Sequence, residues 1–296
     1  MPDFLRRAAA VLVPAIFASF AAPAFAEGEC PTVRMGAEGH RKAAQLAAKV
    51  LAHLQTTDAK VVLLGRAGSD APQKRFGEKI GFWNYTHAGL AYRNHPAGEW
   101  TVAHLLNICG EESGVFEESF LKFYLDNPHE YRAVAAVPSA PMQDALEDLI
   151  VRRNAAAGYR NGSVYSSISH PFSLARQNSN EYILDTFAAA LARAEDAIIL
   201  SREDAKEYFL SSAHRDKFAP EIIRTNFFEA LGASLGFGPG NATLDDHTPA
   251  ERAAGRFEFV SVGSLIQFLD ELGMLQSAKE FALKDVSKAR DTIVEK

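Results

Sequence analysis

Residues 85–106 read YTHAGLAYRNHPAGEWTVAHLL, and the expected fold is built outward from this stretch. Two runs rich in strand-favouring residues, 85–92 and 100–106, lie on either side of the polar segment RNHPAGE. Pro96 and Gly98 in that segment are typical turn residues. The pattern predicts an antiparallel hairpin.

One histidine lies on each strand of this hairpin, His87 on the first and His104 on the second. A turn centred on residue 96 sets Ala88 opposite His104, whereas a one-residue bulge sets the two imidazoles side by side. Small residues next to His87 leave its ring accessible, as a catalytic base requires. A hydrogen-bonded strand histidine without a catalytic role is the simpler interpretation of either residue taken alone.

Helices and strands are intermixed along the rest of the chain, without internal repeats. Apolar positions at helical spacing predict helices, and short runs rich in β-branched residues predict strands. The expected helices are 39–56, 117–125, 142–157, 181–193, 201–211, 221–235 and 263–272, with a charged helical tail at 277–296, and the further strands are 61–64, 131–137 and 257–262. This mixture, with a hairpin, favours the α+β class.

The first 26 residues have the three parts of a secretory signal peptide. Two arginines precede an apolar run, and Ala24-Phe25-Ala26 forms an A-x-A cleavage site. The run is short, alanine-rich and interrupted by proline, which indicates a cleaved signal rather than a membrane anchor. We therefore expect one exported domain at 27–296, with a core spanning 60–268, in the bacterial periplasm.

Cleavage removes Arg6, Arg7 and Asp3 and leaves 29 basic and 36 acidic side chains, a net charge of −7. An acidic chain without a basic block is a poor candidate for binding nucleic acid or an anionic membrane surface. After cleavage we expect no membrane-spanning segment. We find no P-loop, H-E-x-x-H or C-x-x-C motif, which argues against nucleotide hydrolases, zinc proteases and thioredoxin-like enzymes.

Cys30 and Cys109 are the only cysteines, and both remain after cleavage. In an oxidising compartment they most simply form one disulfide, which ties the mature N-terminus to residues 107–110. A catalytic thiol at Cys109 is the alternative. We favour the disulfide because an unpaired reactive thiol is hard to keep reduced outside the cytoplasm.

The polar stretch QNSNE, residues 177–181, lies at the start of the helix expected at 181–193. Free N–H groups and the helix dipole stabilise negative charge at such a position, which suits a nucleophile or an oxyanion. Asparagine and serine are also preferred N-cap residues, so capping is the competing interpretation.

Asp245-Asp246-His247 forms a further polar group in a late loop. An adjacent acid and imidazole suit metal binding or the orientation of a base, and a solvated loop explains them equally well. Because no further histidine or cysteine stands at ligand spacing, we expect neither a metal nor a cofactor.

Several unusual blocks occur in an order that resembles a known bacterial family, domain of unknown function 2145. They are LLGRAGSD, YTHAGLAYR, WTVAHLLNICG, FYLDNPHEYRAVAAVP, PFSLARQNSNEYILD and LDDHTPAERAAGRFEFVSV. The resemblance covers most of the mature chain and implies an exported protein, without implying an activity.

The chain more remotely resembles permuted NlpC-type, papain-like proteins. Thr86-His87-Ala88-Gly89-Leu90 is similar to the strand motif that carries their catalytic histidine, and His104 matches the polar residue that orients it. The stretch 178–183 is similar to their helix-start motif, with Ser179 at the position of the nucleophilic cysteine. The resemblance implies a papain-like core, an antiparallel sheet packed on helices, with a C-terminal helical elaboration.

The expected function is that of a periplasmic hydrolase or acyltransferase acting on an amide or ester in a cell-wall peptide or lipidated molecule. Ser179 is the expected nucleophile, His87 the base and His104 its orienting group. The expected binding residues are Asn178, Asn180, Asp246 and His247. A serine needs a well-placed base before it attacks. The alternative is a non-catalytic periplasmic binding or accessory protein that uses the same groove.

Overall fold

The computed structural model describes residues 34–67, 85–109, 112–126, 130–160, 164–224, 242–283 and 293–294. All of them belong to one unit, Val33–Lys296. The expected signal peptide and Cys30 lie outside the described residues, as does the side chain of Cys109. Export and the disulfide therefore stay predictions.

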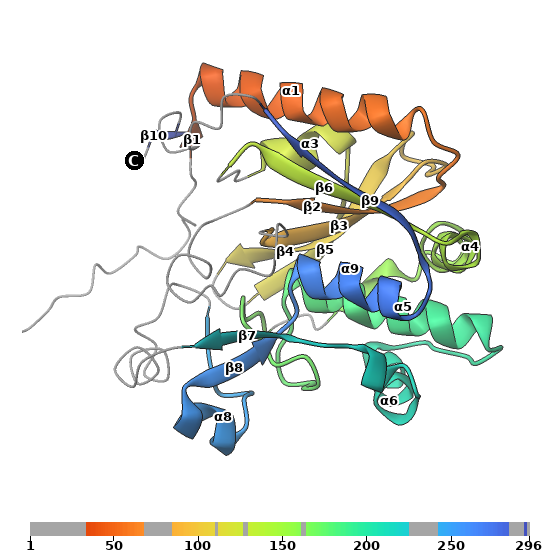
Figure 1. The fold of residues 1–296 in the computed structure, drawn as a ribbon, viewed down its shortest axis with the longest axis vertical. Coiled ribbons are helices and arrows are strands. Elements are labelled where there is room, and N and C mark those ends of the chain that lie inside the picture. The colour runs from red at the N-terminus through yellow and green to blue at the C-terminus, as the bar shows by residue number, and fades with distance from the viewer. Residues whose placement is uncertain are drawn as a thin grey trace, which may run out of the picture. The chain divides into compact units, whose positions relative to one another are not determined.

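An antiparallel sheet of six strands lies at the centre of this unit (Figure 1). Its strand order is β5-β4-β3-β2-β6-β9. The strands are β2 (Val61–Arg66), β3 (His87–Tyr92), β4 (Thr101–Cys109), β5 (Glu112–Glu118), β6 (Arg132–Pro138) and β9 (Leu275–Ala282). β2 is buried along its whole length, as expected for a continuous apolar run covered on both faces.

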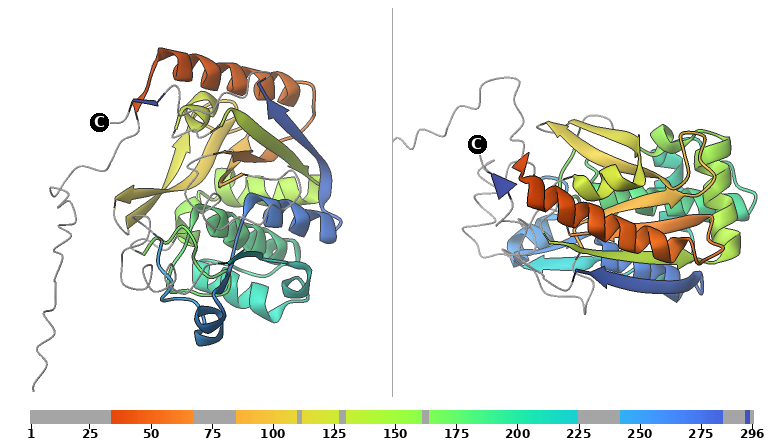
Figure 2. Two further views of the ribbon diagram at one scale, coloured as in Figure 1. Left: turned by 60° about the vertical axis from the view of Figure 1, so that its left-hand side comes forward. Right: turned by 90° about the horizontal axis from the view of Figure 1, so that it is seen from above.

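Helices cover both faces of the sheet (Figures 1 and 2). One face carries α1 (Ala37–Leu54) and α3 (Phe120–Leu125), and the other carries α4 (Ala140–Glu147), α5 (Ser179–Ala194) and α9 (Val262–Glu271), with α6 (Arg202–Ser211) packed on α5. Successive β2 residues alternate between two cores, with Val62 facing α1 and Leu63 facing α5. This alternation is the period of a strand.

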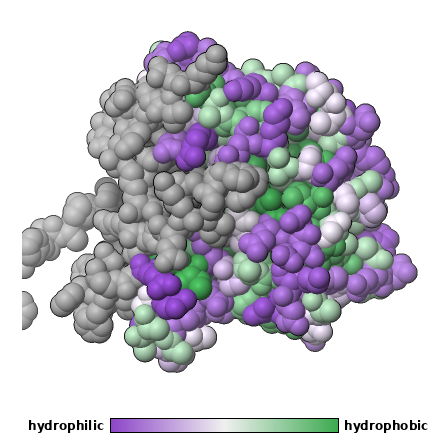
Figure 3. Space-filling view, viewed as in Figure 1, coloured by the Kyte–Doolittle hydropathy of each residue, from purple (hydrophilic) through white to green (hydrophobic). Residues whose placement is uncertain are grey.

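Smaller elements complete the unit. β1 (Arg34–Met35) pairs with β10 (Ile293–Val294), and β7 (Glu221–Arg224) pairs with β8 (Arg256–Phe259), which follows α8 (Pro249–Ala254). A π-helical segment, Asp148–Arg152, extends α4, and 3₁₀ turns occupy Ala156–Tyr159 and Arg215–Lys217. Among the coloured residues of the face shown in Figure 3, hydrophilic ones predominate, with smaller apolar areas between them. In the part of the chain that the structure describes, no helix is both long and apolar enough to span a bilayer.

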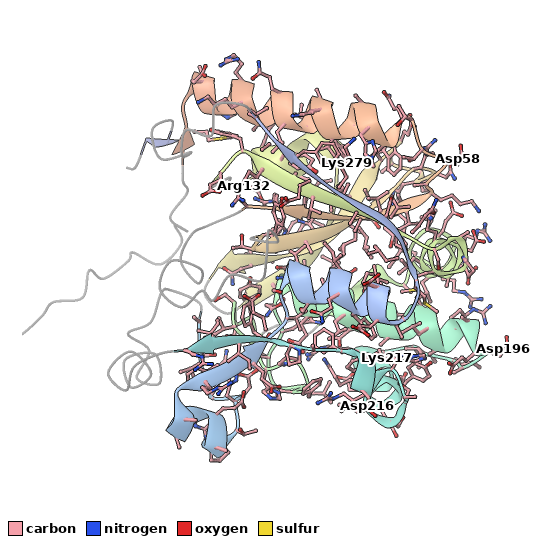
Figure 4. The ribbon with its side chains drawn as sticks, in the orientation of Figure 1. Asp58, Arg132, Asp196, Asp216, Lys217 and Lys279 are labelled. Atoms are coloured by element: carbon pink, nitrogen blue, oxygen red, sulfur yellow. The ribbon has the colours of Figure 1, made fainter. Side chains whose placement is uncertain are left out.

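The α+β class and the packing of an antiparallel sheet against helices are confirmed. The charged helical tail predicted at 277–296 is wrong at 277–282 and 293–294, which belong to strands β9 and β10, and residues 284–292 and 295–296 lie outside the described part. Phe281 of β9 is buried opposite Ala133 of β6, and Lys279 Nζ lies 3.5 Å from His53 Nδ1 of α1 (Figure 4). Pairing with β6 thus overrides the local helical tendency of this charged run.

Two other helix predictions are corrected at their first residues. The helix expected at 221–235 begins instead as strand β7, whose Ile223 is buried in a small cluster with Phe257. Residues 225–235 lie outside the described part. The helix expected at 117–125 begins at Phe120, since 117 and 118 end strand β5.

Four charged side chains join α5 to α6 inside the protein, each at most 2% exposed. Arg202 Nη2 lies 2.7 Å from Glu181 Oε1, and its Nε lies 2.9 Å from Asp185 Oδ2. Lys206 Nζ lies 2.9 Å from Glu181 Oε1 and 2.7 Å from Asp185 Oδ1. Two acids and two bases thus form a neutral buried cluster, which we call the charge cluster.

The charge cluster also fixes the loop that leads into α5. Arg202 donates to the carbonyls of Leu174 and Arg176, at 2.9 and 2.8 Å, and Lys206 donates to that of Pro171 at 2.7 Å. Buried charges require partners of this kind, because desolvation otherwise outweighs their attraction. The cluster therefore sets the position at which α5 begins.

Removing one charge from this cluster is expected to destabilise the fold strongly. We expect Lys206→Met to lower the free energy of unfolding by about 3–5 kcal/mol, since it leaves a buried carboxylate uncompensated. The matched control is Lys60→Met, which breaks the exposed Lys60–Asp144 pair and is expected to change little. Urea denaturation followed by circular dichroism measures both. Equal losses in the two variants would contradict the role given to the cluster.

Candidate active site

The start of α5 separates the helix cap from the candidate nucleophile. Asn178 is the N-cap, and its Oδ1 accepts hydrogen bonds from the N–H groups of Asn180 and Glu181, at 2.9 and 2.8 Å. Ser179 is the first helical residue, and its hydroxyl does not cap the helix. Among the described residues, the Ser179 N–H has no hydrogen-bond acceptor. This amide at a helix N-terminus is therefore available to an anion.

Asn180 joins this helix start to the beginning of β3. Its Nδ2 donates to the carbonyl of Thr86 at 3.2 Å and to that of Val260 at 3.1 Å. The Asn178 Nδ2 and Asn180 Oδ1 atoms are buried without partners in the described part of the chain. Such atoms destabilise a fold and recur at functional sites.

The hairpin has a register that differs from both expected alternatives. Leu90 pairs with Ala103 and Tyr92 pairs with Thr101, so the same register continued sets Gly89 opposite His104. His87 is two residues from Gly89 and is therefore the diagonal neighbour of His104 on the same face. The two rings meet edge to face at 5.1 Å between centroids without a bulge.

Because Gly89 has no side chain, the Phe123 ring can pack over the imidazoles of His87 and His104. A Cβ at this position would lie 2.6 Å from Val102 Cγ1 and 3.0 Å from Phe123 Cε2. The Phe123 ring packs on both imidazoles, with centroids 5.8 Å from that of His87 and 5.4 Å from that of His104. The small residue therefore lets α3 close over the histidine pair.

Hydrogen-bond distances connect four side chains in one row. His87 Nδ1 lies 3.1 Å from Ser179 Oγ, and His87 Nε2 lies 2.8 Å from His104 Nδ1. His104 Nε2 lies 3.3 Å from Glu118 Oε2. The structure thus brings together Ser179, His87 and His104, and adds Glu118, which the sequence did not single out.

The carboxylate at one end fixes the direction of every proton in the row. The hydrogen bond from His104 lowers the pKa of Glu118, so this group is an acceptor at neutral pH. His104 Nε2 then carries a proton, and Nδ1 of the neutral ring accepts from His87 Nε2–H. His87 Nδ1 is left as an unprotonated acceptor facing the Ser179 hydroxyl.

Burial and a nearby cation keep His87 neutral. Burial lowers its pKa well below 6.5, and the positive charge of Arg66 lowers it further. Burial also lowers the pKa of His104, although Glu118 opposes this shift. Arg66 is paired with His87 across β2 and β3, and its guanidinium lies 3.5 Å from Asp126. No pattern in the sequence groups Arg66 with the site.

Tyr165 is a further member of the site that the sequence did not indicate. A parallel bridge to Gln177 sets Tyr165 beside the approach to α5. Burial raises the pKa of Tyr165 to about 12, although the Ser179 hydroxyl lies close enough to its phenol to lower this pKa. The phenol therefore stays protonated and can donate. The polar, aperiodic composition of 163–180 contained no signal of this contact.

Asp246 and His247 hold the neighbouring loop. Asp246 Oδ2 accepts from the His170 N–H at 2.8 Å, and His247 Nε2 lies 2.7 Å from the Ile168 carbonyl. His247 Nδ1 lies 3.3 Å from Glu251 Oε1. The hydrogen bonds of the described residues do not link either side chain to Ser179. No group of three metal-ligating side chains occurs among these residues.

A surface hollow lies at the opposite end of the strands. Residues 56–60, before β2, line it together with Val137, Gln143, Asp144 and Ser277. Ser179 and His87 instead lie where β2 ends and β3 begins, and the row crosses the sheet diagonally from there to Glu118. The hollow contains no nucleophile paired with a base, so the chemistry of the row carries the argument for the site.

The fold and this row of side chains define an α+β protein in which a serine at the start of a helix lies within hydrogen-bond distance of a histidine base. A family model described as uncharacterized protein conserved in bacteria, DUF2145, matches residues 53–269. The chain belongs to this family. No curated protein and no solved structure gives a significant match.

The burial of His87 predicts how its protonation and the stability of the protein change with pH. We expect the His87 imidazole to stay neutral as the pH falls through 6.5, because burial and Arg66 disfavour its cation. The unfolded chain then binds more protons than the folded one, so stability is expected to fall as the pH drops below 6.5. Nitrogen-15 NMR of histidine-labelled protein measures the titration, with His87→Gln identifying the signal. A His87 midpoint near 6.5 would contradict this prediction.

Proposed function

We propose that the protein is a hydrolase or acyltransferase that acts on an amide or ester through Ser179. The observation that carries the proposal is the row Ser179–His87–His104–Glu118, which leaves an unprotonated imidazole nitrogen 3.1 Å from a serine hydroxyl. A nucleophile, a base and an oriented partner for the base are the parts that acyl transfer needs.

The chemistry proceeds in two halves. The Ser179 oxygen attacks the substrate carbonyl and forms a C–O bond, and its proton passes to His87 Nδ1. The tetrahedral intermediate then expels the amine or alcohol, which takes the proton from His87, and an acyl-enzyme remains. Water or a second acceptor then gives a proton to the same nitrogen and attacks the ester carbonyl. The bond from this carbonyl carbon to the Ser179 oxygen breaks, the serine takes the proton back from His87, and the acid or transferred acyl product leaves.

His104 and Glu118 act on the base rather than on the substrate. They orient the His87 ring and spread the charge that it acquires when it takes the proton. The Ser179 N–H, at the start of α5, and the Tyr165 hydroxyl supply donors for the negative oxygen of the intermediate. These donors are already fixed by the charge cluster and the Tyr165–Gln177 bridge.

The order of base strand, orienting residue and nucleophile helix supports a permuted NlpC-type, papain-like core. Asn178 and Asn180, next to the nucleophile, are proposed to frame the substrate, and Asp246 and His247 to support the loop over it. We further propose that the protein acts in the periplasm after cleavage behind Ala26, on a cell-wall peptide or a lipidated molecule.

The direct test is labelling of the purified protein with a fluorophosphonate, which reacts with activated serines. We expect Ser179→Ala to abolish labelling and His87→Ala to slow it by about 10²–10⁴-fold, the typical contribution of a general base. His104→Gln is expected to slow it less, because this residue acts through His87.

Ser234 supplies the matched control, since GASLG at 232–236 fits the G-x-S-x-G pattern of another serine hydrolase class. It lies outside the described residues. Ser234→Ala is expected to keep full labelling. Loss of label there, with label retained in Ser179→Ala, would move the nucleophile to Ser234. Absence of label from the folded wild type would favour a non-catalytic binding protein.

Tyr165 allows a separate test of the oxyanion donors. We expect Tyr165→Phe to lower kcat by about 10²-fold, the effect of losing one such donor, with a small change in KM. Turnover of a chromogenic ester measures both constants. An unchanged kcat would remove Tyr165 from the proposed mechanism.

A further inference from the structure

An apolar strip extends sideways from the candidate site on the same face of the sheet. The β3–β4 pairing ends at Leu90–Ala103, and β4 continues from there beside β5, where Leu106 is paired with Gly114. His104 is paired with Phe116. Cross-strand partners share a face, so these positions run from His104, whose Nδ1 lies 2.8 Å from Nε2 of the base His87, to the edge of the sheet.

The strip consists of Leu106, Ile108 and Phe116, packed over Gly114. A Cβ at Gly114 would lie 2.9 Å from Phe116 Cε2 and 3.2 Å from Ile108 Cδ1, so both side chains lie over the glycine. Ile108 is nevertheless 47% exposed and Phe116 36% exposed. Single exposed apolar residues are ordinary on a protein surface, whereas these form a continuous patch that begins beside the base.

We infer that this strip binds the acyl chain of the substrate. The inference rests on the proposed function, since the carbonyl attacked by Ser179 must lie beside His87, where the strip begins. The base lies on β3 and the outer part of the strip on β5, two strand spacings or about 10 Å away, a distance that a medium-length acyl chain covers. The strip itself has no charged side chain at these positions, so it suits methylene groups better than a peptide. Among the substrate classes proposed above, it selects lipidated molecules.

Esters of increasing chain length test this inference. We expect kcat/KM for p-nitrophenyl octanoate to exceed that for the acetate by about tenfold or more, because each buried methylene adds to binding. Ile108→Ser and Phe116→Ser should remove most of this preference, because the octanoate rate falls much more than the acetate rate. Octanoyl p-nitroanilide, tested in parallel, distinguishes an amide from an ester link.

Ile198→Ser is the matched control, because Ile198 is 79% exposed, follows α5 and does not belong to the strip. It should keep the wild-type chain-length preference. A wild type without any preference, or strip variants that retain it in full, would overturn the inference.

A binding measurement separates this inference from the proposed catalysis. Calorimetry with octanoate and acetate is performed on Ser179→Ala, which cannot turn over through Ser179. Tighter binding of octanoate, lost when Phe116→Ser is added, would support the strip even if no ester is hydrolysed. Equal affinity for octanoate and acetate would overturn it.

Discussion

The buried charge cluster of Glu181, Asp185, Arg202 and Lys206 is the constraint on which the rest of the site depends. It contributes little to net stability compared with an apolar core of the same volume, since desolvation offsets most of the attraction. Its main effect is to fix the position and orientation of α5. Buried charges have no water to replace a lost partner, so only a few arrangements of the cluster satisfy all of them. The first turns of α5 are therefore held in one position relative to α6 and to the loop that carries Tyr165.

From that fixed helix start, the site is assembled by elements distant in the chain. β3 supplies the base, β4 the ring that orients it, β5 the carboxylate, and β2 the cation that keeps the base neutral. Each strand contributes one polar side chain to a row that crosses the sheet diagonally, from the end of β2 to Glu118 of β5. The hydrophobic cores on both faces hold these strands in register. The same packing therefore also keeps the side chains of the row from Ser179 to Glu118 within hydrogen-bond distance of one another.

Much of the architecture could be predicted from local pattern. The helix at 39–56, the buried strand at 61–64, the hairpin and the helix near 181–193 all have strong periodicity or composition, and each occurs. The wrong predictions concern segments whose secondary structure is determined by pairing with a distant strand. β9 has a charged, helix-like composition, and only its alignment with β6 makes it a strand. Likewise, the sequence suggested that Ser179, His87 and His104 belong together, but Glu118 was assigned to a helix and Tyr165 lay in an aperiodic loop.

The position of β9 has a consequence for how the protein can be cut. The family match ends at residue 269, yet the sheet does not, because β9 covers the outer edge of β6. A fragment trimmed to the match would uncover a row of backbone donors and acceptors on an apolar strand, a template for self-association. It would also lose most of α1, which shields one core. The segment that matches the family model is therefore shorter than the segment that has to be present for the sheet and its cores to be complete.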